Sequence, residues 1–227
     1  FSSFDEGRIE ELIKKVRPAA DGTVTEEKST AKKEWSPQLY DLTELQREAN
    51  RKFNYSAKET LNIMQRLYET HKVLTYPRTD SRYLSSDIVP SIKERLEACG
   101  VGPYRKLAGR LMNQKIEAKP SFVDDKKVTD HHAIIPTEQF VQLDHMTVDE
   151  RRIYDLVVRR FLAVLYPPFE YQQTQVTLTA AGEIFEARGK IVKNLGWKEV
   201  YETQNQLEEE EEWELREQRL PELKKGQ

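Results

Sequence analysis

Residues 74–83 read Leu-Thr-Tyr-Pro-Arg-Thr-Asp-Ser-Arg-Tyr, and this stretch says more about the fold and the chemistry than any other. Residues 73–76 form a short β-run, and Pro77 ends it because its ring fixes φ and removes a backbone donor. Tyr76 therefore stands at the end of a predicted strand, two residues before Arg78. A phenol beside a fixed cation suits nucleophilic attack on phosphorus, since its ordinary pKa of about 10 requires a positive field or a base.

A tyrosine on a plain edge strand, followed by a polar turn, is the alternative for this stretch alone. Other segments bear on the choice. Residues 129–137 read Thr-Asp-His-His-Ala-Ile-Ile-Pro-Thr, and residues 187–191 read Ala-Arg-Gly-Lys-Ile. Residues 37–46 lead into one helical pattern, and residues 65–69, Gln-Arg-Leu-Tyr-Glu, close a second.

Taken in order, these segments resemble the type IA DNA topoisomerases, enzymes that cut one DNA strand through a tyrosine ester. The family carries a His-x-Ala-Ile-x-Pro segment after its tyrosine, and His131 falls on the family's histidine. Pro77 after the tyrosine, and one extra residue between Gln65 and Tyr76, are similar to the topoisomerase III branch. The resemblance covers most of residues 36–201.

The adjacent histidines His131 and His132 also suggest a metal site. Two ligands are too few, however, and the single Cys99 is distant in sequence and has no Cys-x-x-Cys companion. A histidine that pairs with phosphate or with Asp80, and gains charge as the pH falls, fits the pattern better.

The composition is that of a soluble protein with a broad hydrated surface. The 227 residues are 37% hydrophobic and 33% charged, and they suffice for one large domain or two modest ones. No run approaches the roughly 20 apolar residues of a membrane span, and no signal peptide opens the chain. One cysteine excludes an internal disulfide, so we expect a reducing, cytoplasmic compartment, with nucleoid association if the source is bacterial.

The charge is unevenly distributed along the chain. The formal net charge is −3, but residues 202–227 alone carry −5, which leaves +2 on residues 1–201. A mildly basic body can bind phosphates through a local groove. The run Glu208–Glu212 is interpreted as part of a solvated linker, not as a metal site.

The ends of the chain suggest an internal fragment of a larger enzyme. The sequence begins at Phe1, without methionine, and ends shortly after Leu-Pro-Glu-Leu at residues 220–223. In the family such a segment leads into another domain. The family's N-terminal metal-binding domain, with its carboxylates, has no counterpart here.

Helical patterns fill the middle of the chain. Residues 5–16 predict a short amphipathic segment, whereas residues 19–36 are polar and interpreted as flexible. Thr43 with Gln46, and Ser56 with Glu59, predict two capping boxes. Two short helices followed by a strand indicate a helix-turn-helix-like unit. Its predicted buried stripe comprises Leu61, Met64, Leu67 and Tyr68.

The clearest predicted helix begins at Thr147, which pairs with Glu150 in a capping box, and continues to about Leu165. Its apolar residues repeat with helical spacing. Four arginines lie on it, and a solvated face is the favoured interpretation over DNA contact: Arg151, Arg152, Arg159 and Arg160.

From Tyr171 the periodicity changes to that of strands, with a turn at Ala181-Gly182. In the family such strands belong to an arched domain, joined by residues near the N-terminus. We therefore predict an α+β fold, in which a mainly helical tyrosine domain is inserted into a β-rich arch. The predicted division is residues 1–36 and 169–203 for the arch, 37–168 for the tyrosine domain and 204–227 for an acidic linker.

The resemblance implies an isomerase that cleaves and rejoins one DNA strand. Tyr76 would become joined to a 5′ phosphate, Arg78 would stabilise the transition state, and the freed 3′ hydroxyl would reverse the step. The DNA-contacting positions then include a larger set: Gln65, Glu69, Thr79, Asp80, Ser81, Arg82 and His131.

The resemblance also implies magnesium in the full-length enzyme, bound by the missing N-terminal domain, and no metal in this fragment. The expected partner is single-stranded DNA, the expected state a monomer without membrane attachment, and the fragment alone is expected to be inactive. The alternatives are a non-catalytic module that grips DNA, another tyrosine recombinase or topoisomerase class, and a purely structural arch.

Overall fold

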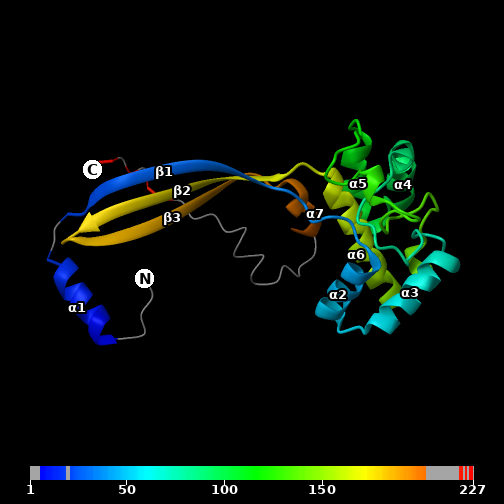
Figure 1. The fold of residues 1–227 in the computed structure, drawn as a ribbon, viewed down its shortest axis with the longest axis horizontal. Coiled ribbons are helices and arrows are strands. Elements are labelled where there is room, and N and C mark those ends of the chain that lie inside the picture. Colours follow the sequence, from blue (N-terminus) through cyan, green and yellow to red (C-terminus); the bar gives the residue numbers. More distant parts are fainter. Residues whose placement is uncertain (1–5, 19–20, 203–219, 222, 224, 227) are drawn as a thin grey trace. The chain divides into compact units, whose positions relative to one another are not determined.

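The computed structural model describes residues 6–18, 21–202, 220, 221, 223, 225 and 226. The chain divides into two compact units, each described by itself. The strand unit comprises segments 1–34, 170–195 and 207–227, and the helical unit comprises segments 35–169 and 196–206. Figure 1 shows their elements with the labels used below.

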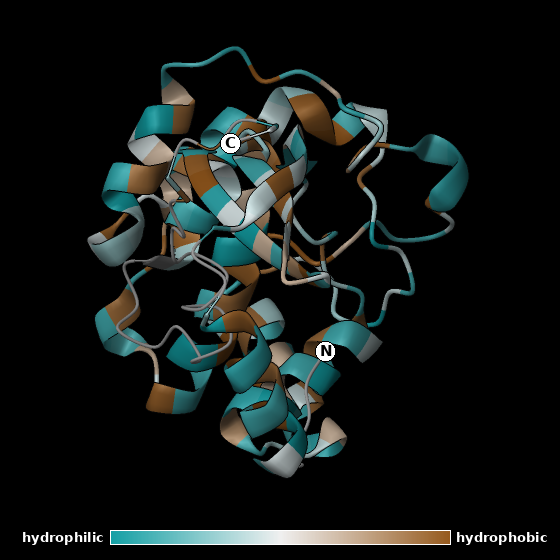
Figure 2. Ribbon diagram, turned by 90° about the vertical axis from the view of Figure 1, so that its left-hand side faces the viewer, coloured by the Kyte–Doolittle hydropathy of each residue, from teal (hydrophilic) through white to brown (hydrophobic). Residues whose placement is uncertain are grey.

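Six α-helices are found in the described part of the helical unit: α2 (Leu42–Phe53), α3 (Ala57–Glu69), α4 (Ile92–Cys99), α5 (Arg105–Met112), α6 (Val148–Leu165) and α7 (Glu199–Glu202). Helix α6 packs against α2, α3, α5 and α7, and most of its 18 residues are buried. Figure 2 shows hydrophobic and hydrophilic residues alternating along the helices, as amphipathic helices require. The core is therefore built around α6.

Helix starts follow the predicted caps in two of three cases. The boxes of Ser56 with Glu59 and of Thr147 with Glu150 are both present, so those predictions are confirmed. The box predicted at Thr43 is wrong. Helix α2 is capped one residue before it begins by Asp41, whose carboxylate accepts the Glu44 N–H at 2.7 Å. Asp is a preferred N-cap residue, and its carboxylate satisfies a donor that the helix leaves unpaired.

The prediction of a solvated arginine face is wrong for Arg159 and Arg160, which are buried. Arg151 and Arg152 are exposed. Helix α6 is surrounded by other elements toward its C-terminal end, so cations there need internal partners. The Arg160 guanidinium donates to three acceptors: the Gln38 carbonyl at 2.9 Å, the Tyr40 hydroxyl at 2.9 Å and the Glu48 carboxylate at 2.7 Å.

The buried stripe of α3 differs from the predicted one at Tyr68. Met64 and Leu67 are fully buried, and Ile63 is nearly so, but Leu61 is only half-buried. The Tyr68 side chain is 37% exposed. The helix turns the line through positions 60, 63, 64 and 67 toward α2 and α6, which leaves Tyr68 at the edge of the packed face.

The prediction of a regular β-strand at residues 73–76 is wrong. This segment is extended, but it forms a single isolated bridge, between Leu74 and Pro136. Prolines explain the shortness of the pairing, because Pro77 on one side and Pro136 on the other both lack a backbone donor.

Helix α1 (Glu6–Val16) and strands β1 (Thr23–Glu34), β2 (Phe169–Ala180) and β3 (Glu183–Asn194) form the strand unit, in which Phe169 alone lies outside the unit's segments. The sheet order is β1-β2-β3, and β2 pairs with β3 in antiparallel register. Ala181 and Gly182 connect them with φ values of 51° and 78°. The predicted strands and their turn are confirmed, and two positive φ values suit the twist of a tight hairpin.

The flexibility predicted for residues 19–36 is wrong over residues 23–34, which form β1. Its only buried residue is Val24, so the sequence lacks the apolar alternation that would reveal a strand. Hydrogen bonds of the sheet attach it to β2, and polar side-chain contacts add to them. The Thr25 hydroxyl donates to the Thr177 carbonyl at 3.1 Å, and Lys33 pairs with Glu170 at 2.7 Å.

The predicted α+β class is confirmed by these elements. Phe169 and residues 196–202 pack with the helical unit, whereas the predicted division grouped them with the strands. The acidic linker predicted at 204–227 lies mostly outside the described residues. In the part of the chain that the structure describes, no helix has the length and apolar character needed to cross a membrane.

Glu150 supplies a pH-dependent share of stability at the start of α6. Its carboxylate accepts from Arg66 at 2.8 Å and from the Thr147 N–H at 2.9 Å, and His71 lies at 3.3 Å. Burial alone raises the pKa of this carboxyl, but these partners together lower it from 4.5 to about 2.

We predict that Glu150→Gln lowers the free energy of unfolding by about 1–2 kcal/mol at pH 7, because glutamine can keep the cap but not the charge. A carboxyl whose pKa is lower in the folded state stabilises above its unfolded pKa, and this contribution is lost as the pH falls toward 2. Urea unfolding at several pH values checks this. Asp144→Asn, at an exposed carboxylate, is the control, and a difference from wild type as large at pH 2 as at pH 7 would contradict the prediction.

Candidate active site

One segment distant in sequence, residues 133–135, holds the backbone beside Tyr76. The Thr75 N–H donates to the Ile135 carbonyl at 3.0 Å, and the Thr75 hydroxyl accepts the Ile135 N–H at 3.0 Å. The same hydroxyl donates to the Ala133 carbonyl at 3.3 Å. These bonds fix the residue immediately before Tyr76 against the His-His-Ala-Ile-Ile segment.

Thr79 makes a second connection between the two segments. Its buried hydroxyl donates to the His131 carbonyl at 2.9 Å and accepts the Ser81 N–H at 3.1 Å. Ser81 is also buried, and its hydroxyl donates to the Lys127 carbonyl at 2.8 Å. The hydroxyls of these two predicted DNA contacts are therefore occupied within the protein.

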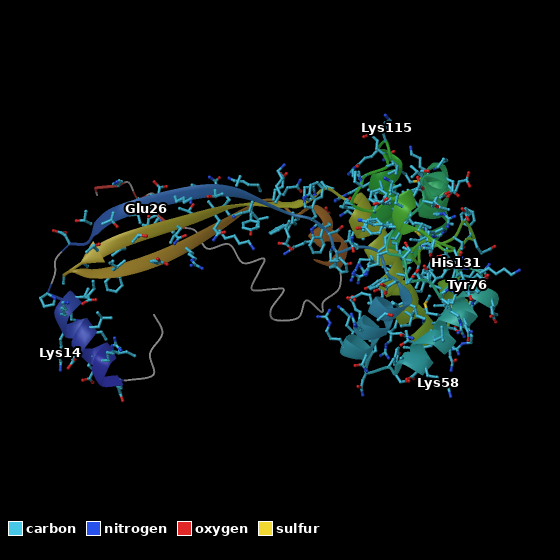
Figure 3. The ribbon with its side chains drawn as sticks, viewed as in Figure 1. Lys14, Glu26, Lys58, Tyr76, Lys115 and His131 are labelled. Carbon is cyan, nitrogen blue, oxygen red and sulfur yellow. The ribbon has the colours of Figure 1, made fainter. Side chains whose placement is uncertain are left out.

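Three aromatic rings meet at the site. The Tyr76 and His131 rings lie 4.4 Å apart between centroids, at an angle of 40°. The Tyr68 ring meets Tyr76 edge to face, with centroids 5.5 Å apart and an angle of 79°. Figure 3 labels Tyr76 and His131 beside each other in the helical unit. The Tyr76 ring thus has an aromatic neighbour on each of two segments, α3 and the histidine segment.

Polar side chains without protein partners accompany these rings. Arg78 and Asp80 follow the tyrosine and are exposed. Gln65 and Glu69 lie four residues apart on α3, on the face that carries Tyr68. Among the described residues, none of these four side chains, nor the Tyr76 hydroxyl, forms a hydrogen bond or ion pair.

Arg82 differs from Arg78 in this respect. Its guanidinium pairs with Asp41 at 3.3 Å and with Glu44 at 2.9 Å, both at the start of α2. The predicted contact residues therefore separate into two groups. Gln65, Glu69, Arg78, Asp80 and His131 present side chains to solvent or to Tyr76, whereas Thr79, Ser81 and Arg82 hold the loop.

The two histidines lie in different environments. The His131 ring is exposed beside Tyr76, but His132 is half-buried, with Nδ1 2.7 Å from the Ala133 carbonyl. Burial lowers the pKa of His132, so its ring is neutral at pH 7 and donates from Nδ1. Within the described ranges, no three His, Cys, Asp or Glu side chains gather in a way that would hold a metal ion.

Sequence reasoning did not identify Tyr68 or Thr75 as parts of this site. Tyr68 carried a usable signal, because it lies three residues after Gln65 and one before Glu69 on a helix. Thr75 carried none, since its role depends on which carbonyl lies opposite. Chemically, the arrangement offers a positioned phenol, a guanidinium without an ion-pair partner among the described residues, and an imidazole, a set suited to a phosphodiester.

Comparison with known proteins gives one family. The sequence model of a family described as DNA topoisomerase matches residues 1–227. DNA topoisomerase 3 of Bacillus thuringiensis (strain Al Hakam) is 57% identical over 225 residues, which are 99% of this chain and 30% of that protein. DNA topoisomerase 3 of Bacillus subtilis (strain 168) is 49% identical over 224 residues, with the same coverage of 99% and 30%.

Among solved structures, full-length topoisomerase I from Thermotoga maritima is similar, with a TM-score of 0.66 and 25% identity. The match covers 99% of this chain and 34% of that one. The chain thus spans about 30% of the length of the curated relatives it matches. The predicted resemblance to the topoisomerase III branch is confirmed by the names of those relatives.

We predict that Thr79→Val destabilises the chain by about 1–3 kcal/mol, because it leaves the His131 carbonyl and the Ser81 N–H without their partner in a buried place. Chemical unfolding measures the loss. Thr137→Val is the matched control, since the Thr137 hydroxyl donates to the Lys72 carbonyl in an exposed hydrogen bond. Equal losses in the two variants would show that the Thr79 hydrogen bonds stabilise the chain no more than the exposed Thr137 bond does, which would contradict the prediction.

Proposed function

This chain belongs to the type IA DNA topoisomerase family, and we propose that Tyr76 is its strand-cleaving nucleophile. The proposal rests on the difference between the Tyr76 ring, which has neighbours, and the Tyr76 hydroxyl, which has none among the described residues. The Tyr76 ring is held between Tyr68 and His131, yet its hydroxyl has no partner among the described residues. A group held in place but left unbonded is arranged to react with something outside the protein.

The proposed reaction is a reversible transesterification on single-stranded DNA. The Tyr76 oxygen attacks a phosphorus of the DNA backbone, and the phenol proton passes to a proton acceptor. The bond from phosphorus to the 3′ oxygen breaks. The 5′ phosphate becomes the tyrosine ester, and the 3′ oxygen takes up a proton. After strand passage the 3′ hydroxyl attacks the ester and releases the tyrosine. The ester conserves the bond energy, so no nucleotide cofactor is needed.

Arg78 supplies the complementary charge in this proposal, and His131 supplies an imidazole hydrogen-bonding group. Arg78 is exposed and without an ion-pair partner in the described part of the chain, so its planar fork is available to phosphate oxygens. Stabilising the charge that develops on those oxygens is the usual role of such a group. His131 lies against the Tyr76 ring, and we assign it to a contact with the phosphate that Tyr76 attacks.

The remaining contact residues have different proposed roles. Gln65 can donate to and accept from a base or sugar. Glu69 and Asp80 are anionic, so we assign them to base amino groups and not to phosphates. Thr79, Ser81 and Arg82 act through the loop that presents Arg78, because their polar groups already have protein partners.

Magnesium belongs to the proposal for the complete enzyme only. The described residues offer no ligand set of three acidic, histidine or cysteine side chains, so they do not fit a magnesium site by themselves. We propose that carboxylates from a part of the enzyme outside this chain bind the ion, which would supply charge neutralisation at the phosphate.

The proposed setting is a bacterial cytoplasm, with the protein associated with the nucleoid and acting as a monomer. The named relatives are bacterial DNA topoisomerases, which favours this setting. A second candidate function, single-stranded DNA binding without cleavage, is favoured for the chain by itself because it spans about 30% of those relatives.

We predict that Tyr76→Phe abolishes relaxation of supercoiled DNA and the covalent adduct, while single-stranded DNA affinity stays within about twofold, because only the attacking oxygen is lost. The enzyme for this test is the Bacillus thuringiensis relative in which this chain replaces the matching region. Tyr83→Phe is the matched control, since that hydroxyl has Gln38 and Lys127 as partners. An adduct formed by the Tyr76→Phe enzyme would overturn the assignment.

We predict that the chain alone binds single-stranded DNA weakly and loses it as salt rises, without cleaving it. Arg78→Gln should reduce the slope of log affinity against log salt by about 0.7, the value for one phosphate contact on a single strand. Fluorescence anisotropy measures the slope. Arg110→Gln, at a surface arginine paired with Glu199, should leave it unchanged. Equal slopes for the wild-type and Arg78→Gln chains would remove Arg78 from the DNA-binding surface.

A further inference from the structure

Tyr68 is a large aromatic residue left at the surface of the helical unit. Its side chain is 37% exposed, although its neighbour Leu67 is fully buried. It stands on α3 between Gln65 and Glu69, and its ring meets the Tyr76 ring edge to face at 5.5 Å. Core packing therefore does not explain why an aromatic ring occupies this position.

The position of the Tyr76 ring depends on packing. Its hydroxyl forms no hydrogen bond among the described residues, so no polar contact restrains rotation of the side chain. The backbone on one side is fixed through Thr75, but a tyrosine side chain still has two torsions to fix. The rings of His131 and Tyr68 are two of the contacts that limit these torsions.

We infer that Tyr68 is a positioning residue for strand cleavage, which holds the Tyr76 phenol in the orientation from which it attacks phosphorus. The inference rests on the proposed function of Tyr76. Edge-to-face aromatic pairs contribute about 2- to 10-fold in an equilibrium or rate constant beyond the effect of their buried area. Misplacing a reacting atom by about 1 Å can cost a hundredfold in rate, so a contact of this size has a measurable effect on catalysis.

This role differs from two others that the same residue could have. A ring that stacks on a DNA base would contribute to binding affinity. A ring that merely fills the surface would contribute to stability. Loss of a positioning residue instead lowers the rate of the chemical step at saturating DNA, with affinity and stability little changed.

The test uses the Bacillus thuringiensis relative that carries this chain in place of its matching region. Single-turnover cleavage of an end-labelled oligonucleotide is measured, together with the dissociation constant of that oligonucleotide and the unfolding midpoint of the enzyme.

Tyr68→Ala should lower the cleavage rate about 2- to 10-fold, with the dissociation constant within twofold. Tyr68→Phe keeps the ring and should cleave at nearly the normal rate. Tyr68→Leu replaces Ala if Ala fails to fold. Phe140→Ala, at another exposed aromatic, should change nothing.

A second measurement needs no activity. In the chain itself, labelled with ¹³C-tyrosine, the Tyr76 ring signal is assigned by its loss in Tyr76→Phe. Relaxation of that signal should show a more mobile ring in Tyr68→Ala and an unchanged one in Tyr68→Phe.

The outcomes separate the inference from the function on which it rests. An inactive chimera with unmodified Tyr76 would count against the proposed function, and the ring measurement would then decide the role of Tyr68. A normal cleavage rate in Tyr68→Ala, or an equally rigid Tyr76 ring, would overturn the inference. A loss of affinity as large as the loss of rate would also overturn it, and would assign Tyr68 to base stacking.

Discussion

Residues 73–79 and 131–137 are joined by hydrogen bonds that run mainly through two threonine hydroxyls, and each contact at Tyr76 depends on this pairing. Thr75 binds the Ile135 and Ala133 backbone, and Thr79 binds the His131 carbonyl. Regular strands would provide more hydrogen bonds, but Pro77 and Pro136 exclude them. Hydroxyls replace the missing backbone donors. This arrangement brings the Tyr76 and His131 rings together although the two residues are far apart in sequence.

The helical unit supports that pairing with buried charges whose partners are internal. The Arg95 guanidinium, from α4, donates to the Pro136 carbonyl at 2.8 Å and pairs with Glu138 at 2.6 Å. Glu150 and Arg160 fix the two ends of α6 in a similar way. Removing one member of such a set leaves a buried charge unpaired, which is costly. The polar groups beside Tyr76 contrast with these, because they are exposed and lack protein partners among the described residues.

Prediction from sequence worked where a local rule controls the outcome. Two capping boxes, the Ala181-Gly182 turn and the α+β class followed from short patterns. Prediction from sequence failed where a residue distant in sequence determines the burial or the secondary structure. The burial of Arg160 depends on acceptors more than 100 residues away, β1 forms by pairing with the distant β2, and the edge position of Tyr68 depends on how α3 packs. The motifs identified Tyr76 and His131 as candidates. Only the structure shows which of the predicted contact residues have side chains without partners among the described residues.

Identification of the DNA-linked peptide tests the central claim most directly. Trypsin cuts after Lys72 and Arg78 and releases residues 73–78, Val-Leu-Thr-Tyr-Pro-Arg, in which Tyr76 is the single tyrosine. Tyr68 and Tyr83 fall on other peptides. The chimeric enzyme is trapped on an oligonucleotide by denaturation, digested with nuclease and trypsin, and analysed by mass spectrometry. The account predicts a nucleotide attached through its 5′ phosphate to the peptide 73–78. A nucleotide on another peptide, or one attached through a 3′ phosphate, would contradict it.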